Sequence, residues 1–222
     1  MNTLIINLKN YSEILGNQSV KLASAAEAVA AKHSKIEIIV APPHPALGLV
    51  AARVRIAVFS QSVSDVEGGM TTGAVIPEAV VAVGASGTLL NHSEARVDPV
   101  HIERLIPRLK KAGLKVCLCA NSDTEAEELS RFRPEYLAVE PPELIGSGIA
   151  VSKARPEVVS DTVLRARRAG YEGKVLCGAG IVEGRDVEAA VKLGAEGVLV
   201  ASSVVKAKNW EEKIEELAAS LT

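Results

Sequence analysis

The sequence has few aromatic residues, no excess of charge and no long apolar run. Aromatic residues make up 3% of the 222 positions and apolar residues 48%, so a core must be built from Val, Ile, Leu and Ala. The net charge is -2, without a block of Lys and Arg, which argues against nucleic acid as a partner. No apolar run reaches the roughly 18 residues of a membrane span, and the first residues do not have the pattern of a signal peptide. We therefore expect a cytoplasmic protein that does not bind a membrane.

Cysteine is also scarce, and the three that occur are Cys117, Cys119 and Cys177. An odd number in a chain without a secretory signal argues against a disulfide framework. Cys117 and Cys119 stand two apart in a strand-like run, so we expect both to face the same side as small buried residues. A metal site is the alternative interpretation, but further ligands at a recognisable spacing are missing, and we expect no metal.

Short apolar runs rich in β-branched residues or leucine recur along the chain. Each is nearly continuously apolar, as is typical of parallel strands buried on both faces. The runs are residues 3–8, 36–41, 56–61, 87–91, 115–120, 136–140, 174–178 and 197–201. Between them, apolar residues recur at helical spacings of three and four, for example at Leu22, Ala26 and Val29. Residues typical of helix ends agree with this division, with prolines near helix starts and glycines after helix ends: Pro77, Pro156, Gly113, Gly170 and Gly194.

Eight strand-then-helix units without a break predict an α/β fold, a (β/α)8 TIM barrel that spans residues 1–222 as a single domain. The competing fold is an open, doubly wound sheet, which normally carries G-x-G-x-x-G after its first strand. This chain has NLKNYSEILG at that place, residues 7–16, so we favour the barrel. The chain is shorter than the roughly 250 residues typical of the fold, which leaves little room for a second domain.

Polar residues follow three of the predicted strands: Asn7 and Lys9 the first, His92 the fourth and Glu140 the sixth. Active sites of such barrels lie at the carboxyl ends of the strands. Each residue also has a structural interpretation: Lys9 could be solvated, His92 could cap a helix or fill the core, and Glu140 could pair with a neighbouring lysine. In the barrel all four point into one mouth, which packing alone does not require. The other histidines are expected at the surface: His33, His44 and His101.

Small residues follow the sixth, seventh and eighth predicted strands, as GSG at 146–148, CGAG at 177–180 and ASSV at 201–204. Without bulky side chains, backbone N–H groups can surround the oxygens of a phosphate, and a helix N-terminus adds partial positive charge. Glycine and serine also serve ordinary turns. Because the three segments lie in adjacent connections, we favour a phosphate site.

These motifs resemble the triosephosphate isomerase family. Asn7-Leu8-Lys9 is similar to its N-x-K motif, His92-Ser93-Glu94 to its H-S-E motif, and AVEPPELIGSG at 138–148 to its catalytic base and lid. The PPELIG lid and the ASSV turn resemble the short, archaeal-type branch. The resemblance covers the whole chain and implies an isomerase of glycolysis and gluconeogenesis, which interconverts dihydroxyacetone phosphate and D-glyceraldehyde 3-phosphate through an enediolate without a cofactor.

The resemblance also implies a role for each site residue. Glu140 is the base, neutral His92 polarises the carbonyl, and Lys9 neutralises anionic charge. Asn7 positions the substrate oxygen, and Glu94 orients Lys9 or the start of the next helix and does not itself react. The residues implied to bind substrate or its phosphate are Asn7, Lys9, Ile145, Gly146, Gly180, Ala201 and Ser202.

The chain departs from the wider family at the lid. The usual Y-G-G-S after strand seven is replaced by residues 177–180, Cys-Gly-Ala-Gly, and the lid lacks the tryptophan often seen after its first proline, so the usual latch is missing. The resemblance implies a homodimer or homotetramer, with a loop that contains Thr72 and Gly73 reaching a partner subunit and Gln61 nearby. Two alternatives remain: another phosphate-binding barrel enzyme, such as a Schiff-base aldolase, or a phosphate-binding regulatory protein without turnover.

Overall fold

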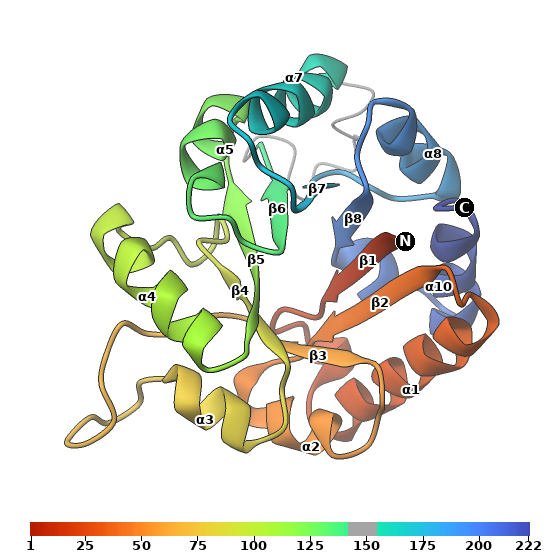
Figure 1. The fold of residues 1–222 in the computed structure, drawn as a ribbon. Coiled ribbons are helices and arrows are strands. Elements are labelled where there is room, and N and C mark those ends of the chain that lie inside the picture. The colour runs from red at the N-terminus through yellow and green to blue at the C-terminus, as the bar shows by residue number, and fades with distance from the viewer. Residues whose placement is uncertain (142–154) are drawn as a thin grey trace.

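Parallel strands close into a barrel in the computed structural model, which describes residues 1–141 and 155–222 (Figure 1). Eight strands follow one another around the ring in chain order, and the first pairs with both the second and the eighth. They are β1 Asn2–Asn7, β2 Ile36–Ala41, β3 Ala57–Ser60, β4 Gly87–Leu90, β5 Lys115–Ala120, β6 Tyr136–Val139, β7 Lys174–Cys177 and β8 Gly197–Val200. Each lies within one residue of a predicted run, so the predicted (β/α)8 barrel is confirmed.

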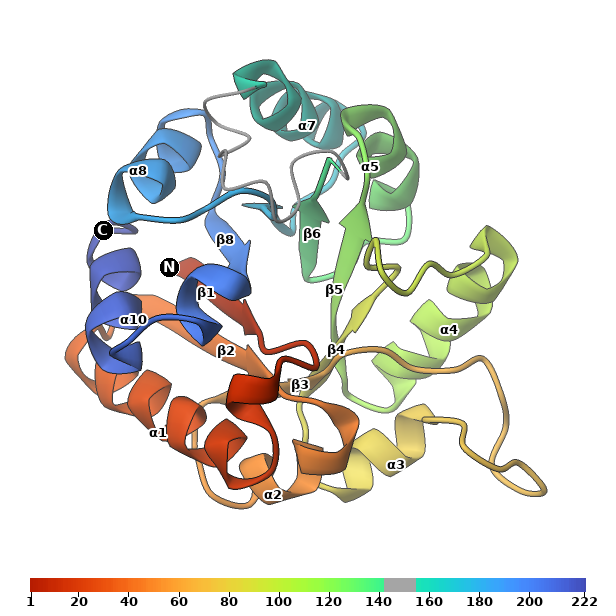
Figure 2. The same cartoon turned by 180° about the vertical axis from the view of Figure 1, so that it is seen from behind.

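Helices surround the barrel and cover the outer faces of the strands (Figures 1 and 2). The α-helices are α1 Asn17–Lys32, α2 Leu47–Ala51, α3 Pro77–Ala82, α4 Pro99–Lys111, α5 Asp123–Ser130, α7 Pro156–Arg168, α8 Gly184–Lys192, α9 Ser202–Val205 and α10 Trp210–Ala219. Short 3-10 helices occur at η1 Ser12–Ile14 and η2 His44–Ala46. Pro77 and Pro156 are first helical residues, and Gly113 and Gly170 follow α4 and α7 with φ of 76°. The helix ends predicted from these residues are confirmed.

The apolar core has two layers. The larger layer lies between strands and helices, and the smaller one fills the barrel with residues such as Ile5, Phe59 and Leu176. Cys117 and Cys119 face this interior and are buried and free, as predicted from their spacing. Within the described residues, no group of three or more His, Cys, Asp or Glu side chains could hold a metal ion, and no helix is long and apolar enough to cross a membrane.

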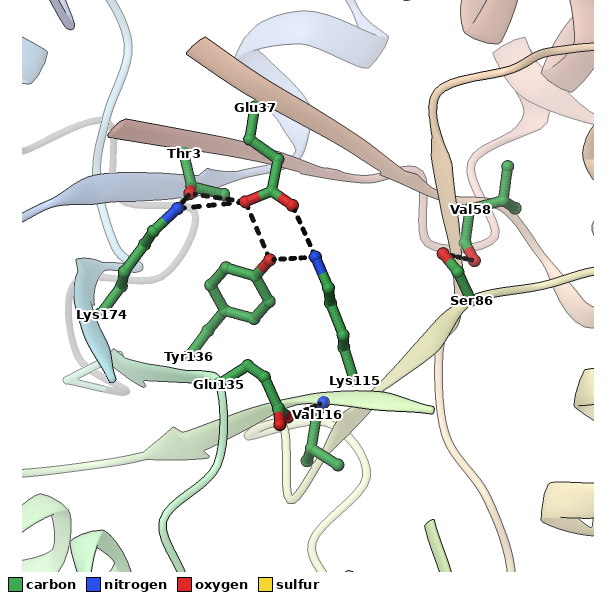
Figure 3. Close-up of polar contacts among 9 residues, drawn as sticks. All are labelled: Thr3, Glu37, Val58, Ser86, Lys115, Val116, Glu135, Tyr136 and Lys174. Carbon is green, nitrogen blue, oxygen red and sulfur yellow. Dashed lines mark hydrogen bonds and ion pairs between the residues drawn. The ribbon is translucent and has the colours of Figure 1, made fainter. Parts of the chain in front are cut away.

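A polar network closes the amino end of the barrel (Figure 3). Glu37 of β2 accepts hydrogen bonds from Lys115 at 2.9 Å, Tyr136 at 2.9 Å and Lys174 at 3.1 Å, which begin β5, β6 and β7. Thr3 of β1 donates to the same carboxylate at 3.2 Å. Burial opposes ionisation of Glu37, but the donors outweigh it and lower the pKa of its carboxyl to about 2. One carboxylate thus joins five strands of the barrel.

Candidate active site

The carboxyl ends of β1, β4 and β6 bring the predicted site residues together. Asn7, Lys9, His92 and Glu140 line one cavity of about 70 Å³. The opposite wall of the cavity consists of the connections after β7 and β8, which include the predicted Gly180, Ala201 and Ser202. The other two predicted phosphate-binding residues, Ile145 and Gly146, lie outside the described residues.

Lys9 is held in an unusual backbone conformation at the mouth of the barrel. Its φ is 48°, in the left-handed region that non-glycine residues rarely adopt. The Lys9 N–H donates to the Asn7 side-chain oxygen at 3.0 Å, and the Gln61 amide donates to the Lys9 carbonyl at 3.0 Å. The Lys9 ammonium forms a salt bridge with Glu94 at 2.7 Å. Both the backbone and the charge of Lys9 are therefore held in place before any ligand binds.

His92 is buried in the loop that follows β4, and its hydrogen bonding defines its tautomer. The backbone N–H of Glu94 donates to His92 Nδ1 at 3.1 Å. A nitrogen that accepts a hydrogen bond carries no proton, so the ring is neutral and its proton is on Nε2. Nε2 faces the cavity and lies 3.4 Å from Oε1 of Glu140. The ring can therefore donate a hydrogen bond to a substrate oxygen.

Glu140 directly follows β6 and is buried, with 2% of its surface exposed. Its backbone N–H donates to the Ala120 carbonyl at 2.7 Å, which fixes the main chain. Its side-chain Oε2 has no hydrogen-bond partner within residues 1–141 and 155–222. A buried carboxylate oxygen without a donor is costly for the fold and open to accepting a proton.

Gly178 provides the space in which the Glu140 side chain lies. A Cβ at residue 178 would stand 2.4 Å from Glu140 Cγ, closer than packed atoms approach. The sequence suggested a phosphate contact for residues 177–180 and did not indicate this steric role. The close approach of two strands distant in sequence creates it, so no local pattern could have shown it.

Cys119 lies in the barrel interior near Glu140. A hydrogen bond with Cys117, burial, the nearby charge of Glu140 and a hydrogen bond with the Glu140 side chain together raise the pKa of the Cys119 thiol well above its usual value. The thiol therefore stays protonated and adds no second negative charge below the carboxylate.

The wall after β7 and β8 has the features of an anion site. Gly180 has φ of 72°, which favours glycine, and α9 begins at Ser202, directly after Ala201. The N–H groups of a first helical turn have no partner within the helix and can point at an anion. Gly180, Ala201 and Ser202 line the same cavity as Lys9, so an anion held there lies near a positive charge.

His44 corrects one prediction from the sequence. It was expected at the surface, but it is half-buried, with Nε2 2.9 Å from the Ser60 hydroxyl and 3.1 Å from the Ser62 carbonyl. The turn at η2 folds it back over the end of β3, where it lines a second pocket of about 440 Å³ beside Lys9. His33 is also half-buried and pairs with Glu215. Only His101 is exposed as expected.

Comparison with known proteins gives one consistent result. A family model described as triosephosphate isomerase matches residues 2–217. The triosephosphate isomerase of Methanocaldococcus jannaschii is 47% identical over 214 residues, covering 96% of this chain and 97% of that protein. Those of Cenarchaeum symbiosum and Pyrobaculum islandicum are 45% and 46% identical, each over 99% of this chain and over 97% and 95% of the relative.

Proposed function

Since the chain belongs to the triosephosphate isomerase family, we infer that it interconverts dihydroxyacetone phosphate and D-glyceraldehyde 3-phosphate. The observation that carries this inference is the meeting of Lys9, His92 and Glu140 in one cavity, from three strands distant in sequence. A carboxylate, a neutral imidazole and an ammonium are the groups required to move a proton between adjacent carbons.

We propose that Glu140 is the base. Its carboxylate removes a proton from the carbon beside the substrate carbonyl and returns it to the neighbouring carbon, so no proton is gained or lost overall. The burial of Glu140 supports this role, and so does Oε2, which has no hydrogen bond to give up among the described residues before it accepts the proton.

The other polar residues stabilise the enediolate formed between these transfers. His92 donates from Nε2 to the carbonyl oxygen as negative charge develops there, and it moves protons between the two substrate oxygens. Lys9 neutralises the anionic ligand, and Asn7 holds the Lys9 backbone and positions a substrate oxygen. Glu94 orients the Lys9 ammonium through its salt bridge.

The phosphate of the substrate is proposed to lie against the connections after β7 and β8. The backbone N–H groups of Gly180 and Ser202, with Ala201 between β8 and α9, supply donors there. Ile145 and Gly146 are proposed to complete the site from the segment that follows Glu140. No cofactor is required, because every step transfers a proton.

The assembly is proposed to be a homodimer or homotetramer in the cytoplasm. The loop between β3 and α3 stands away from the barrel (Figure 1), and Met70 near its tip is fully exposed. Asp65 pairs with His101 of α4 at 2.7 Å, which fixes the base of this loop. The Thr72-Gly73 turn is proposed to enter the 440 Å³ pocket of a partner subunit. Size-exclusion chromatography with light scattering would give the subunit number, and a monomer at high concentration would contradict the proposal.

The proposed activity is tested with a coupled assay on D-glyceraldehyde 3-phosphate, using wild type and Glu140→Asp. Shortening the side chain by one methylene withdraws the base by about 1 Å, so we expect kcat to fall by roughly 10²-fold or more while a phosphate-bearing inhibitor binds near wild-type strength. Unchanged kcat would remove Glu140 from the role of base.

Two further measurements separate the alternatives. A Schiff-base aldolase would form a lysine adduct that borohydride traps in the presence of substrate, and we expect no adduct. A binding protein without turnover would leave dihydroxyacetone phosphate free of solvent deuterium, whereas proton transfer through an enediolate incorporates it.

A further inference from the structure

The loop that carries His92 is closed on itself by its first and last residues. Asn91 precedes His92, and its side-chain oxygen accepts a hydrogen bond from the Val97 N–H at 3.0 Å. The Arg96 guanidinium donates from NH1 to the Asn91 carbonyl at 3.2 Å. Within the loop, the Ala95 N–H donates to the His92 carbonyl at 2.8 Å. Residues 91–97 therefore form a loop whose two ends are joined by hydrogen bonds, and this loop carries the His92 imidazole.

Asn91 also fixes the loop of residues 91–97 to the barrel. It is buried, with 1% of its surface exposed and φ of 62°, a left-handed conformation that Asn tolerates better than most residues. Its side-chain amide donates to the Cys119 carbonyl on β5 at 2.9 Å. The same amide donates to the Glu125 carboxylate at 3.5 Å, so the side chain donates to β5 and α5 and accepts from the far end of the loop.

Glu125 of α5 forms the second attachment of the loop. Its carboxylate pairs with NH2 of Arg96 and accepts from the Asn121 N–H at 2.7 Å. The Glu125 N–H donates to the Ser122 hydroxyl oxygen at 3.1 Å, which caps α5. Arg96 thus bridges the start of the His92 loop and the first turn of α5. Neither Asn91, Arg96 nor Glu125 lines the cavity.

We propose that Asn91, Arg96 and Glu125 are positioning residues, which hold the His92 ring in the single orientation and tautomer that aims Nε2–H at the reacting carbonyl. This proposal rests on the proposed function. The Glu94 N–H must stay opposite Nδ1 for the proton to remain on Nε2, and both ends of the segment that carries Glu94 are fixed by these three residues. A loosened loop lets the ring turn and its tautomers mix.

Two variants test the proposal. Asn91→Gly keeps the left-handed backbone without strain and deletes the three side-chain hydrogen bonds of Asn91, with Cys119, Glu125 and Val97. Arg96→Lys keeps the charge but replaces the planar guanidinium, whose NH1 and NH2 donate to the Asn91 carbonyl and to Glu125, with a single ammonium nitrogen that lacks this fixed geometry. We expect each to lower kcat about 10-fold while KM changes less than about 2-fold, because misorientation of a general acid is felt most in the transition state. Arg96→Lys serves alone if Asn91→Gly is too unstable to purify.

Arg167→Lys is the matched control. Arg167 donates from NH1 to the Tyr171 and Gly173 carbonyls, at 2.7 Å each, and pairs with Glu196 at the amino end of the barrel. Its side chain is 36% exposed, against 40% for Arg96, so the two substitutions remove similar contacts at opposite ends. The control is expected to lower Tm as much as Arg96→Lys and to leave kcat unchanged.

A spectroscopic measurement separates this proposal from the proposed function. In wild type, ¹⁵N NMR of His92 should show two well-separated ring nitrogens, one bare and one protonated, and in Asn91→Gly and Arg96→Lys these should move toward each other as the tautomers exchange. If the wild-type protein had no isomerase activity, the proposed function would be refuted, but the difference in the His92 spectrum between wild type and the variants would still support the positioning role. Variants that lose only Tm, with kcat and the imidazole spectrum of wild type, would overturn the positioning role.

Discussion

Each end of the barrel holds a carboxylate among its strands, and the two differ in the hydrogen-bond donors that surround them. At the amino end, Glu37 receives hydrogen bonds from two lysines, a tyrosine and a threonine (Figure 3). At the carboxyl end, Oε2 of Glu140 has no partner within the described residues, and His92 Nε2 lies 3.4 Å from Oε1.

This difference separates a structural charge from a reactive one. The four donors around Glu37 stabilise its ionised form, as its lowered pKa shows, and they also tie strands together. Among the described residues, Oε2 of Glu140 has no such donor, so the burial of this oxygen costs stability, while the oxygen can accept a proton. The same substitution, Glu to Gln, should therefore have opposite consequences at the two ends.

The largest effect is expected at the carboxyl end. Glu140→Gln removes the base and should lower kcat by roughly 10³-fold or more, within the range attributed to general acid–base catalysis. Because Oε2 of this buried carboxylate has no donor among the described residues, replacing the carboxylate with a neutral amide should leave Tm equal to or above that of wild type. Calorimetry and the coupled assay measure both quantities on one preparation. A Tm clearly below wild type would mean that Glu140 contributes to the fold and would weaken the comparison.

A smaller effect, on stability alone, is expected at the amino end. Glu37→Gln leaves two ammonium groups facing each other and should cost about 2 kcal/mol after allowing for partial exposure, or roughly 4–8 °C in Tm for a chain of this size. The kcat should stay within about 2-fold of wild type. Glu128→Gln, at an exposed position of α5, is the control and should change neither. A large loss of kcat in Glu37→Gln would show that the two ends are coupled.

The smallest effect is expected in the thermal stability at acidic pH. The pKa of Glu37 is lowered from 4.5 to about 2 in the folded protein, so its ionised form stabilises the fold above pH 4.5, and this contribution is lost as the pH falls toward 2. The Tm difference between wild type and Glu37→Gln should therefore be constant near neutral pH and shrink between pH 4.5 and 2. Differential scanning calorimetry across this interval checks it. A difference that grows on acidification would contradict the sign of the pKa shift.

Much of the architecture followed from local patterns in the chain. The continuous apolar runs predicted every strand, and Pro77 and Gly113 marked a helix start and a helix end because proline and glycine have special backbone preferences. The N-x-K and H-S-E motifs predicted which side chains would meet. Their meeting depends only on strand direction, since the carboxyl ends of parallel strands share one rim.

Other features could not be predicted from local patterns. His44 was expected at the surface and lies half-buried over the end of β3, because the turn that places it packs against another strand. The supporting contacts of Asn91 appear only once β4, β5 and α5 are neighbours. Glu37 and Lys174 are 137 residues apart in sequence, and Glu37 and Tyr136 are 99 apart.

The sequence by itself determined the order of strands and helices and the identity of the polar residues at strand ends, because apolar periodicity and backbone preferences act within a few residues. Only the tertiary structure decided which carboxylate is surrounded by donors and which has an oxygen without a partner among the described residues. The reason is electrostatic: the state of a charge depends on the donors within a few ångströms, and closing the barrel supplies them from strands far apart in the chain.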